Sequence, residues 1–239
     1  MSRAGAFAGC MRYSDLSVTP LMASAIPVMP KPTQRKRKSR SKPQPKSVFL
    51  NIPYDASFTR LYIAYIAAVS AFGFIPKATL QVSQSRRRLD RILELICSSD
   101  YSLRDLSRVQ LDPTPPQTPR FNMPFELGLT VALQRSKIPR HSWIVLESRP
   151  HRLLKSLSDL NGTDPFIHSG TVIGLLRELS SIFVRTSRRP SVPQMLSIYR
   201  MLCSRIPSVL HLSGSSTPFN ARVFTDLCVL ASLAASRLE

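Results

Sequence analysis

Short apolar runs alternate with stretches of helical periodicity through the middle of the chain. The apolar runs predict strands over 48–50, 78–82, 101–106 and 143–146. Between them, apolar residues recur at helical spacing and predict helices over 61–72, 86–96 and 125–134. Strands that alternate with helices are typical of a parallel sheet covered on both faces. The pattern therefore predicts a doubly wound, mostly parallel α/β sheet.

The C-terminal part of the chain is less regular. A polar stretch over 151–164 predicts a loop, and 166–168 predicts a short fifth strand. Helical spacing returns over 172–183, 192–202 and 223–230, with a break at Arg188, Arg189 and Pro190. We therefore expect an α/β domain over 47–189 and a helical appendage over 190–239 that packs on the sheet domain.

Positive charge is concentrated near the N-terminus but extends over the whole chain. The net charge is +19 for 239 residues, and residues 31–46 hold eight basic side chains and no acidic one. Residues 1–46 carry +9 in all, which leaves +10 for residues 47–239. The first 46 residues show no sustained period and predict a disordered basic tail. The basic body favours anionic partners such as nucleotides, although it can equally be a solubility feature.

Several classes of site are excluded by composition. Eight glycines against 20 prolines argue against a glycine-rich phosphate loop, and the sequence has neither a Walker motif nor a dinucleotide fingerprint. The four cysteines include no CxxC pair, so we expect no zinc site and no disulfide framework, with Cys97 and Cys228 as core thiols. The four histidines are dispersed, and the sequence shows no pairing of a histidine with a serine or cysteine that would support a catalytic triad or a metal site. These observations predict a protein that requires no metal or cofactor.

The longest apolar run is shorter than the ~18 residues of a spanning helix, which predicts a cytoplasmic protein without membrane contact.

Polar residues follow the predicted strands at the ends where ligands bind in open α/β sheets. The first strand runs into residues 51–55, the third into 105–108, and a proline-rich loop leads to Glu126 at the predicted start of a helix. The carboxyl ends of parallel strands lie at one edge of a sheet. We therefore expect these three segments to converge on one site.

The same segments resemble a known family. Residues 105–107 (DLS), followed by a proline loop and residues 122–129 (NMPFELGL), resemble the "DLT … NPNVxYELGLA" pattern of bacterial TIR-like and nucleoside 2-deoxyribosyltransferase-like domains. Residues 49–55 look like the first strand and loop of these domains. The resemblance covers residues 47–185. It implies a flavodoxin-like fold, cleavage of an N-glycosidic bond in NAD or a nucleoside, and Glu126 as the catalytic carboxylate. It also implies self-association and NAD consumption in bacterial defence.

This chemistry assigns roles to the candidate residues. A carboxylate such as Glu126 stabilises the oxocarbenium-like state of ribosyl–base cleavage, and Asp55 or Asp105 is the candidate general acid for a neutral leaving base. Two arginines are candidates for phosphate binding. The substrate-binding candidates are Asn51 and Asn122 for ribose hydroxyls, Tyr54 or Phe121 for stacking on the base, Arg108 and Arg120 for phosphates, and Ser107 beside Asp105.

Each assignment has a structural alternative. With Met123 as N-cap, Glu126 would sit in the first helical turn, where a carboxylate complements the helix dipole by about 0.3–1 kcal/mol. Asp105 can cap the exit of its strand, Asp55 can cap the first helix, and Arg108 can form a surface ion pair. The functional alternative is a non-catalytic nucleotide-sensing or protein-interaction module with the helical appendage as its contact surface. Nucleic-acid binding through the basic residues 31–46 ranks last, because the sequence has no recognisable nucleic-acid fold motif.

Overall fold

The protein contains a five-stranded sheet. The chain is represented by a computed structural model that describes residues 44–81, 87–108, 115–118, 120–136, 141–160 and 162–238. The strands lie in the order β2-β1-β3-β4-β5, and every neighbouring pair is parallel. Their bounds are β1 (Ser47–Asn51), β2 (Ile75–Lys77), β3 (Tyr101–Asp105), β4 (Ser142–Glu147) and β5 (Phe166–Ile167). This is the strand order of flavodoxin-like folds, so the predicted α/β class is confirmed.

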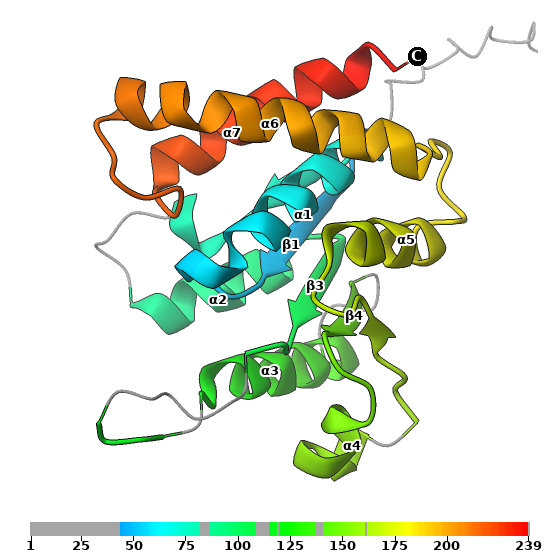
Figure 1. The fold of residues 1–239 in the computed structure, drawn as a ribbon. Coiled ribbons are helices and arrows are strands. Elements are labelled where there is room, and N and C mark those ends of the chain that lie inside the picture. The colour runs from blue at the N-terminus through cyan, green and yellow to red at the C-terminus, as the bar shows by residue number, and fades with distance from the viewer. Residues whose placement is uncertain are drawn as a thin grey trace, which may run out of the picture. The chain divides into compact units, whose positions relative to one another are not determined.

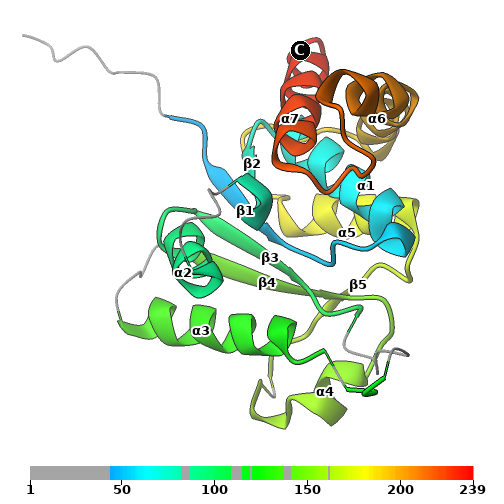
Figure 2. The same cartoon turned by 90° about the vertical axis from the view of Figure 1, so that its left-hand side faces the viewer.

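Helices cover both faces of the sheet (Figure 1, Figure 2). On one face, α1 (Thr59–Ala71) and α5 (Val172–Ile182) pack over Leu50 and Leu103. On the other face, α2 (Arg88–Cys97) and α3 (Asn122–Ser136) pack over Phe49 and Val145. Neighbouring residues of a strand point to opposite faces, so Phe49 and Leu50 contribute to different layers of the core. The short α4 (Arg152–Ser156) follows β4.

The two C-terminal helices cover α1 on the side away from the sheet. Figure 1 shows α6 (Val192–Ser213) and α7 (Ala221–Ser236) lying across α1. Every residue of α1 from Leu61 to Ala71 is buried, because the sheet covers one side of the helix and α6 and α7 cover the other. This explains why α1 is apolar all round rather than on one stripe. Residues 43–239 form one compact unit.

Two predicted elements differ from the structure. The second strand lies at Ile75–Lys77 and not at 78–82. Gly73, with a φ of 77°, turns the chain directly after α1, so Ile75 already pairs with Ser47 and the chain then forms a 3₁₀ turn at Thr79–Gln81. Val82 lies outside the described residues. The polar stretch 151–164 is not a plain loop, because it contains α4 and a further 3₁₀ turn at Ser158–Leu160.

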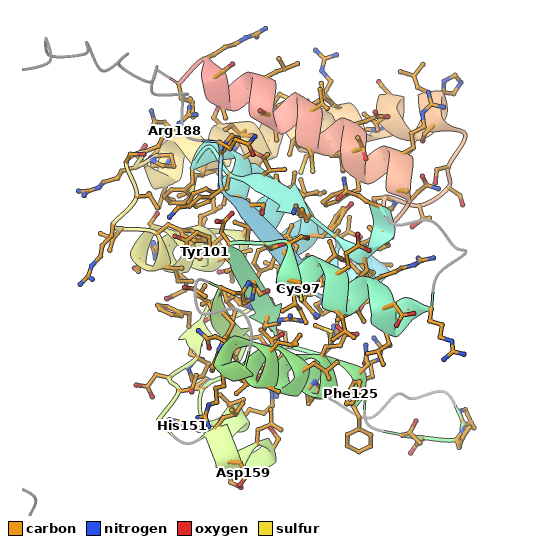
Figure 3. The ribbon with its side chains drawn as sticks, turned by 180° about the vertical axis from the view of Figure 1, so that it is seen from behind. Cys97, Tyr101, Phe125, His151, Asp159 and Arg188 are labelled. Atoms are coloured by element: carbon orange, nitrogen blue, oxygen red, sulfur yellow. The ribbon has the colours of Figure 1, made fainter. Side chains whose placement is uncertain are left out.

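The prediction of a core thiol is wrong for Cys97. The buried positions of α2 are Ile92, Leu95 and Ile96, and Cys97 is about 100° further round the helix than Ile96. Its side chain is therefore exposed at the end of α2 (Figure 3). Cys228 packs against the core of α1 and α7, and burial raises the pKa of its thiol to about 12. Residues 1–43 of the predicted basic tail lie outside the described residues.

Candidate functional site

The buried Glu126 carboxylate lies against the end of the first strand. Asn51 is the last residue of β1, and its Nδ2 donates a hydrogen bond to Glu126 Oε2. Both side chains are buried, with Glu126 only 4% exposed. Two of the segments that the sequence predicts to converge are thus in direct contact.

Helix α3 begins earlier than the sequence predicts. The Phe125 N–H donates to the Phe121 carbonyl at 3.0 Å, and the helix starts at Asn122, so its first turn contains no acidic residue. The predicted N-cap at Met123 is therefore wrong, and Glu126 lies beyond the positions where a carboxylate caps a helix. A capping role does not account for Glu126. Asn122 is exposed at the helix start, and the ring of Phe125 projects from α3 (Figure 3).

Two arginines are close to the Glu126 carboxylate. Arg88, at the start of α2 and with a side chain 67% exposed, places Nη2 3.9 Å from Glu126 Oε1. Arg104 on β3 is fully buried, with Cζ 4.9 Å from the centre of the Phe49 ring. Its Nη2 donates to the Thr130 hydroxyl, which donates to the Glu126 main-chain carbonyl at 3.0 Å. Among the described residues, Arg104 Nε and Nη1 have no hydrogen-bond partner.

Burial also changes the acidity of this cluster. Desolvation lowers the pKa of Arg104 to about 9, although the negative charge of Glu126 opposes the shift. Arg104 therefore keeps its charge at neutral pH. Tyr54 lies next to the same groups, and burial, together with the charge of Glu126, raises the pKa of its phenol to about 12.

The ring of Tyr54 is packed within the protein. Its hydroxyl donates to the Leu50 carbonyl at 3.1 Å. Its ring centre lies 6.2 Å from that of Tyr62 on α1 and 6.0 Å from that of Phe219, which precedes α7. Tyr54 therefore connects the end of β1 to the helical layer. Its role in stacking on a base remains a prediction.

Asp55 lies close to both arginines that the sequence predicts to bind phosphate. Its Oδ1 accepts from the Phe58 N–H at 3.1 Å and caps the short turn Ala56–Phe58. Arg108 Nη2 lies 3.4 Å from Asp55 Oδ1, and Arg120 Nη1 lies 3.6 Å from Asp55 Oδ2. The structure brings these three residues together, in the capping and ion-pair arrangement that is the structural alternative for Asp55 and Arg108.

Asp105 forms a second, fully buried cluster. Its Oδ2 accepts from the Tyr65 hydroxyl at 2.7 Å and lies 3.1 Å from His168 Nε2, and its Oδ1 accepts from the Ser107 N–H at 2.9 Å. The Ser107 hydroxyl also lies 3.1 Å from His168 Nε2, while His168 Nδ1 accepts from the Gly170 N–H at 3.0 Å. Ser107 and His168 are therefore in contact, which the dispersed histidines of the sequence do not reveal.

This cluster nevertheless lacks the geometry of a nucleophilic triad. In a triad, the carboxylate and the serine bind opposite nitrogens of the imidazole. Here Asp105 and Ser107 share His168 Nε2, and Nδ1 accepts from the main chain. The arrangement connects the ends of β3 and β5 to α1.

Asp105 and Glu126 lie on opposite faces of the sheet. The strand register pairs Asn51 with Arg104, so both side chains point toward α2 and α3. Asp105 is the next residue, and its carboxylate meets Tyr65 of α1 on the other face. Seven of the predicted residues therefore form three groups: Asn51 with Glu126, Asp105 with Ser107, and Asp55 with Arg108 and Arg120.

The sequence interpretation missed four residues of these clusters. Arg104 was detectable, because it is the only cation within the apolar third strand. Thr130 follows Glu126 by one helical turn and so shares its face. Arg88 and His168 gave no comparable signal, since their contacts depend on the placement of separate elements.

A cavity of about 560 Å³ lies at the opposite edge of the sheet. It is bordered by the starts of β3 and β4 and by aromatic side chains that include Phe74, Tyr101 and Phe183. It does not reach Glu126. Within the described parts of the chain, we find no group of three or more His, Cys, Asp or Glu side chains that could hold a metal ion.

Comparison with known proteins does not assign this chain to a family. No protein-family model matches the chain, and no curated protein matches it. In the part of the chain that the structure describes, no helix is long and apolar enough to span a bilayer.

Proposed function

We propose that this protein binds a nucleoside or nucleotide at the carboxyl edge of its sheet and hydrolyses the N-glycosidic bond, with Glu126 as the catalytic carboxylate. The observation that carries the proposal is the buried Glu126 side chain, which is 6% exposed and accepts a hydrogen bond from Asn51. Ligands of open α/β sheets bind at this edge. A capping role does not explain a buried carboxylate at this position of α3.

The chemistry requires a fixed negative charge beside the anomeric carbon. A carboxylate there stabilises the oxocarbenium-like transition state, and the effect is larger in a site from which water is excluded. The Asn51 amide holds Oε2 of Glu126, and we assign Oε1, which has Arg88 Nη2 at 3.9 Å, to the sugar. NAD is the first substrate to test, because its nicotinamide leaves as a neutral base and needs no general acid. The resemblance of the sequence to TIR-like domains implies that such an activity serves bacterial defence and requires self-association of the protein.

The test is incubation of the purified chain with NAD and a panel of nucleosides and nucleotides, followed by chromatography of the released bases. We expect release by the wild type and none by Glu126→Gln, which keeps an oxygen that can accept from Asn51. The matched control is Glu94→Gln, which makes the same change at an exposed position of α2. Equal base release by Glu126→Gln and the wild type would refute the catalytic role.

A non-catalytic nucleotide-sensing or interaction module is the second candidate. The observation in its favour is that Glu126 is nearly closed to solvent, while the cavity of about 560 Å³ described above lies at the other edge of the sheet. This candidate predicts saturable binding of a panel member without product, measured by calorimetry on the same samples. Base release that depends on Glu126 would exclude it.

A further inference from the structure

Arg104 is a buried charge that the described protein leaves mostly unsatisfied. Its guanidinium is fully buried between the sheet and α2 and α3. One nitrogen, Nη2, donates to Thr130, and neither Nε nor Nη1 has a partner among the described residues. In the same part of the chain, no carboxylate lies within 4.0 Å of Arg104. Buried charges in proteins are normally paired.

The charge balance of the cluster is positive. Arg88 and Arg104 contribute two positive charges, and Glu126 contributes one negative charge. The fold does not require a cation here, because an apolar side chain over Phe49 would serve the core between β3 and α3. A buried group whose hydrogen-bonding capacity is left open points to a function rather than to folding.

We infer that Arg104 is an anion-binding residue and that the site accepts a phosphorylated nucleotide in preference to the free nucleoside. The nucleotide half of this inference rests on the proposed function. Nη2 donates one of its two hydrogens to Thr130. Its second hydrogen and a hydrogen of the adjacent nitrogen have no partner among the described residues and point in parallel, so the guanidinium still offers one pair of parallel N–H donors, or fork. Such a fork matches two oxygens of a phosphate. Arg88 adds a second cation on the solvent side, 3.9 Å from Glu126.

The charge also complements the reaction proposed for Glu126. A phosphate on Arg104 would fix the ribose while the carboxylate remains available to the anomeric carbon. Both groups lie on the same face of the sheet, and we place one ligand against both. Arg108 and Arg120 are less suited to this role, because Asp55 already neutralises part of their charge.

The test is isothermal titration of the full chain with three probes: inorganic pyrophosphate, a nucleoside 5′-monophosphate and the corresponding nucleoside. The variants are Arg104→Met, Arg104→Lys and the control Arg177→Met, which removes an exposed cation from α5. We expect the wild type and the control to bind the nucleotide more tightly than the nucleoside. Arg104→Met should weaken nucleotide binding by about 10- to 100-fold, the contribution of a hydrogen bond to a charged group. Arg104→Lys, which keeps the charge but loses the fork, should show an intermediate loss.

A second readout separates anion binding from a structural role. Arg104→Met removes an uncompensated buried charge, so its urea midpoint without ligand should equal or exceed that of the wild type. A lower midpoint would overturn the inference, because Arg104 would then stabilise the fold.

The probes also separate this inference from the proposed function. Equal wild-type affinity for nucleotide and nucleoside would overturn the anion site and leave the proposed function standing. If pyrophosphate binds in a manner that depends on Arg104, while neither the nucleotide nor the nucleoside binds, the anion site would stand and the proposed function would be refuted. Pyrophosphate and nucleotide binding that is absent, or that is unchanged in Arg104→Met, would overturn the anion site.

Discussion

The substitution Tyr65→Phe tests whether the buried Asp105 cluster holds the edge of the sheet to α1. Tyr65 and Asp105 are both fully buried, and the phenol donates to Oδ2 at 2.7 Å. The substitution removes that donor and keeps the ring, which lies against Phe58. Asp105 would retain the Ser107 N–H at 2.9 Å and His168 Nε2 at 3.1 Å.

The expected cost follows from these contacts. A buried hydrogen bond to a charged group contributes about 1.5–3 kcal/mol. Because Asp105 keeps two other partners, we expect Tyr65→Phe to lower the free energy of unfolding by about 2 kcal/mol at pH 8. For a unit of this size, that loss corresponds to a decrease in Tm of about 4–8 °C.

The cost should decrease at alkaline pH. Burial, followed by the charge of Asp105, raises the pKa of Tyr65 well above 10. Above about pH 10 the unfolded chain loses this proton while the native protein keeps it, so the native state binds more protons and becomes less stable as the pH rises. The phenylalanine variant lacks this loss, which is on the order of 1 kcal/mol one pH unit above the pKa of the unfolded chain. The difference in the free energy of unfolding between wild type and variant should therefore be smaller at pH 11 than at pH 8 by on the order of 1 kcal/mol.

The assay is urea unfolding followed by circular dichroism and by the fluorescence of Trp143, the single tryptophan, at pH 8 and pH 11. The control is Tyr101→Phe, which removes a hydroxyl that accepts from exposed Lys46 at 3.1 Å and should change stability by less than about 0.5 kcal/mol. A cost for Tyr65→Phe no larger than that of the control, or a difference that stays constant up to pH 11, would refute the reasoning.

Two further predictions concern the helical layer and the thiols. Leu227→Ala in α7, where the side chain is 0% exposed, should lower the free energy of unfolding by about 2–5 kcal/mol. Leu233→Ala on the same helix, 56% exposed, should change it by less than about 0.5 kcal/mol; equal midpoints in urea would contradict the packing of α7. In the native protein, Cys97 should react rapidly with a thiol reagent at pH 8, because it is exposed, whereas Cys228 should react much more slowly than it does in the unfolded chain, because it is partly buried and burial raises its pKa to about 12. Mass spectrometry of labelled peptides distinguishes the two thiols, and rapid native labelling of Cys228 would count against its burial.

The hydrophobic pattern was sufficient to predict the fold, and its errors have local causes. Helical and strand periods identify the layers because each element buries one face or both. The second strand was misplaced because its apolar content is small and Pro76 lies at its centre. Its position depends on the turn at Gly73, which brings Ile75 beside Ser47. The spacing of apolar residues along the sequence does not predict turn geometry of this kind.

The candidate site was only partly predictable. The contact between Asn51 and Glu126 follows from the rule that parallel strands present their carboxyl ends at one edge. The sequence does not predict which face of the sheet Arg104 and Asp105 point to, because the third strand is buried on both faces. The pairing of Ser107 with His168 joins residues 61 positions apart, and it depends on where the short fifth strand ends.

The distribution of buried charge identifies the site better than the cavities do. Among the described residues, the buried Arg, Asp, Glu and His side chains are Arg104, Asp105, Glu126, His141, Glu147 and His168. All except His141 lie at the carboxyl ends of strands or on α3 beside them. Most are satisfied internally: Glu147 accepts from Arg152 Nε at 2.9 Å, and Asp105 has three partners. Of these six buried side chains, Arg104 is the one with nitrogen donors that lack a partner among the described residues. Because an unsatisfied buried charge lowers stability, a ligand that completes its hydrogen bonds supplies the physical reason for its presence.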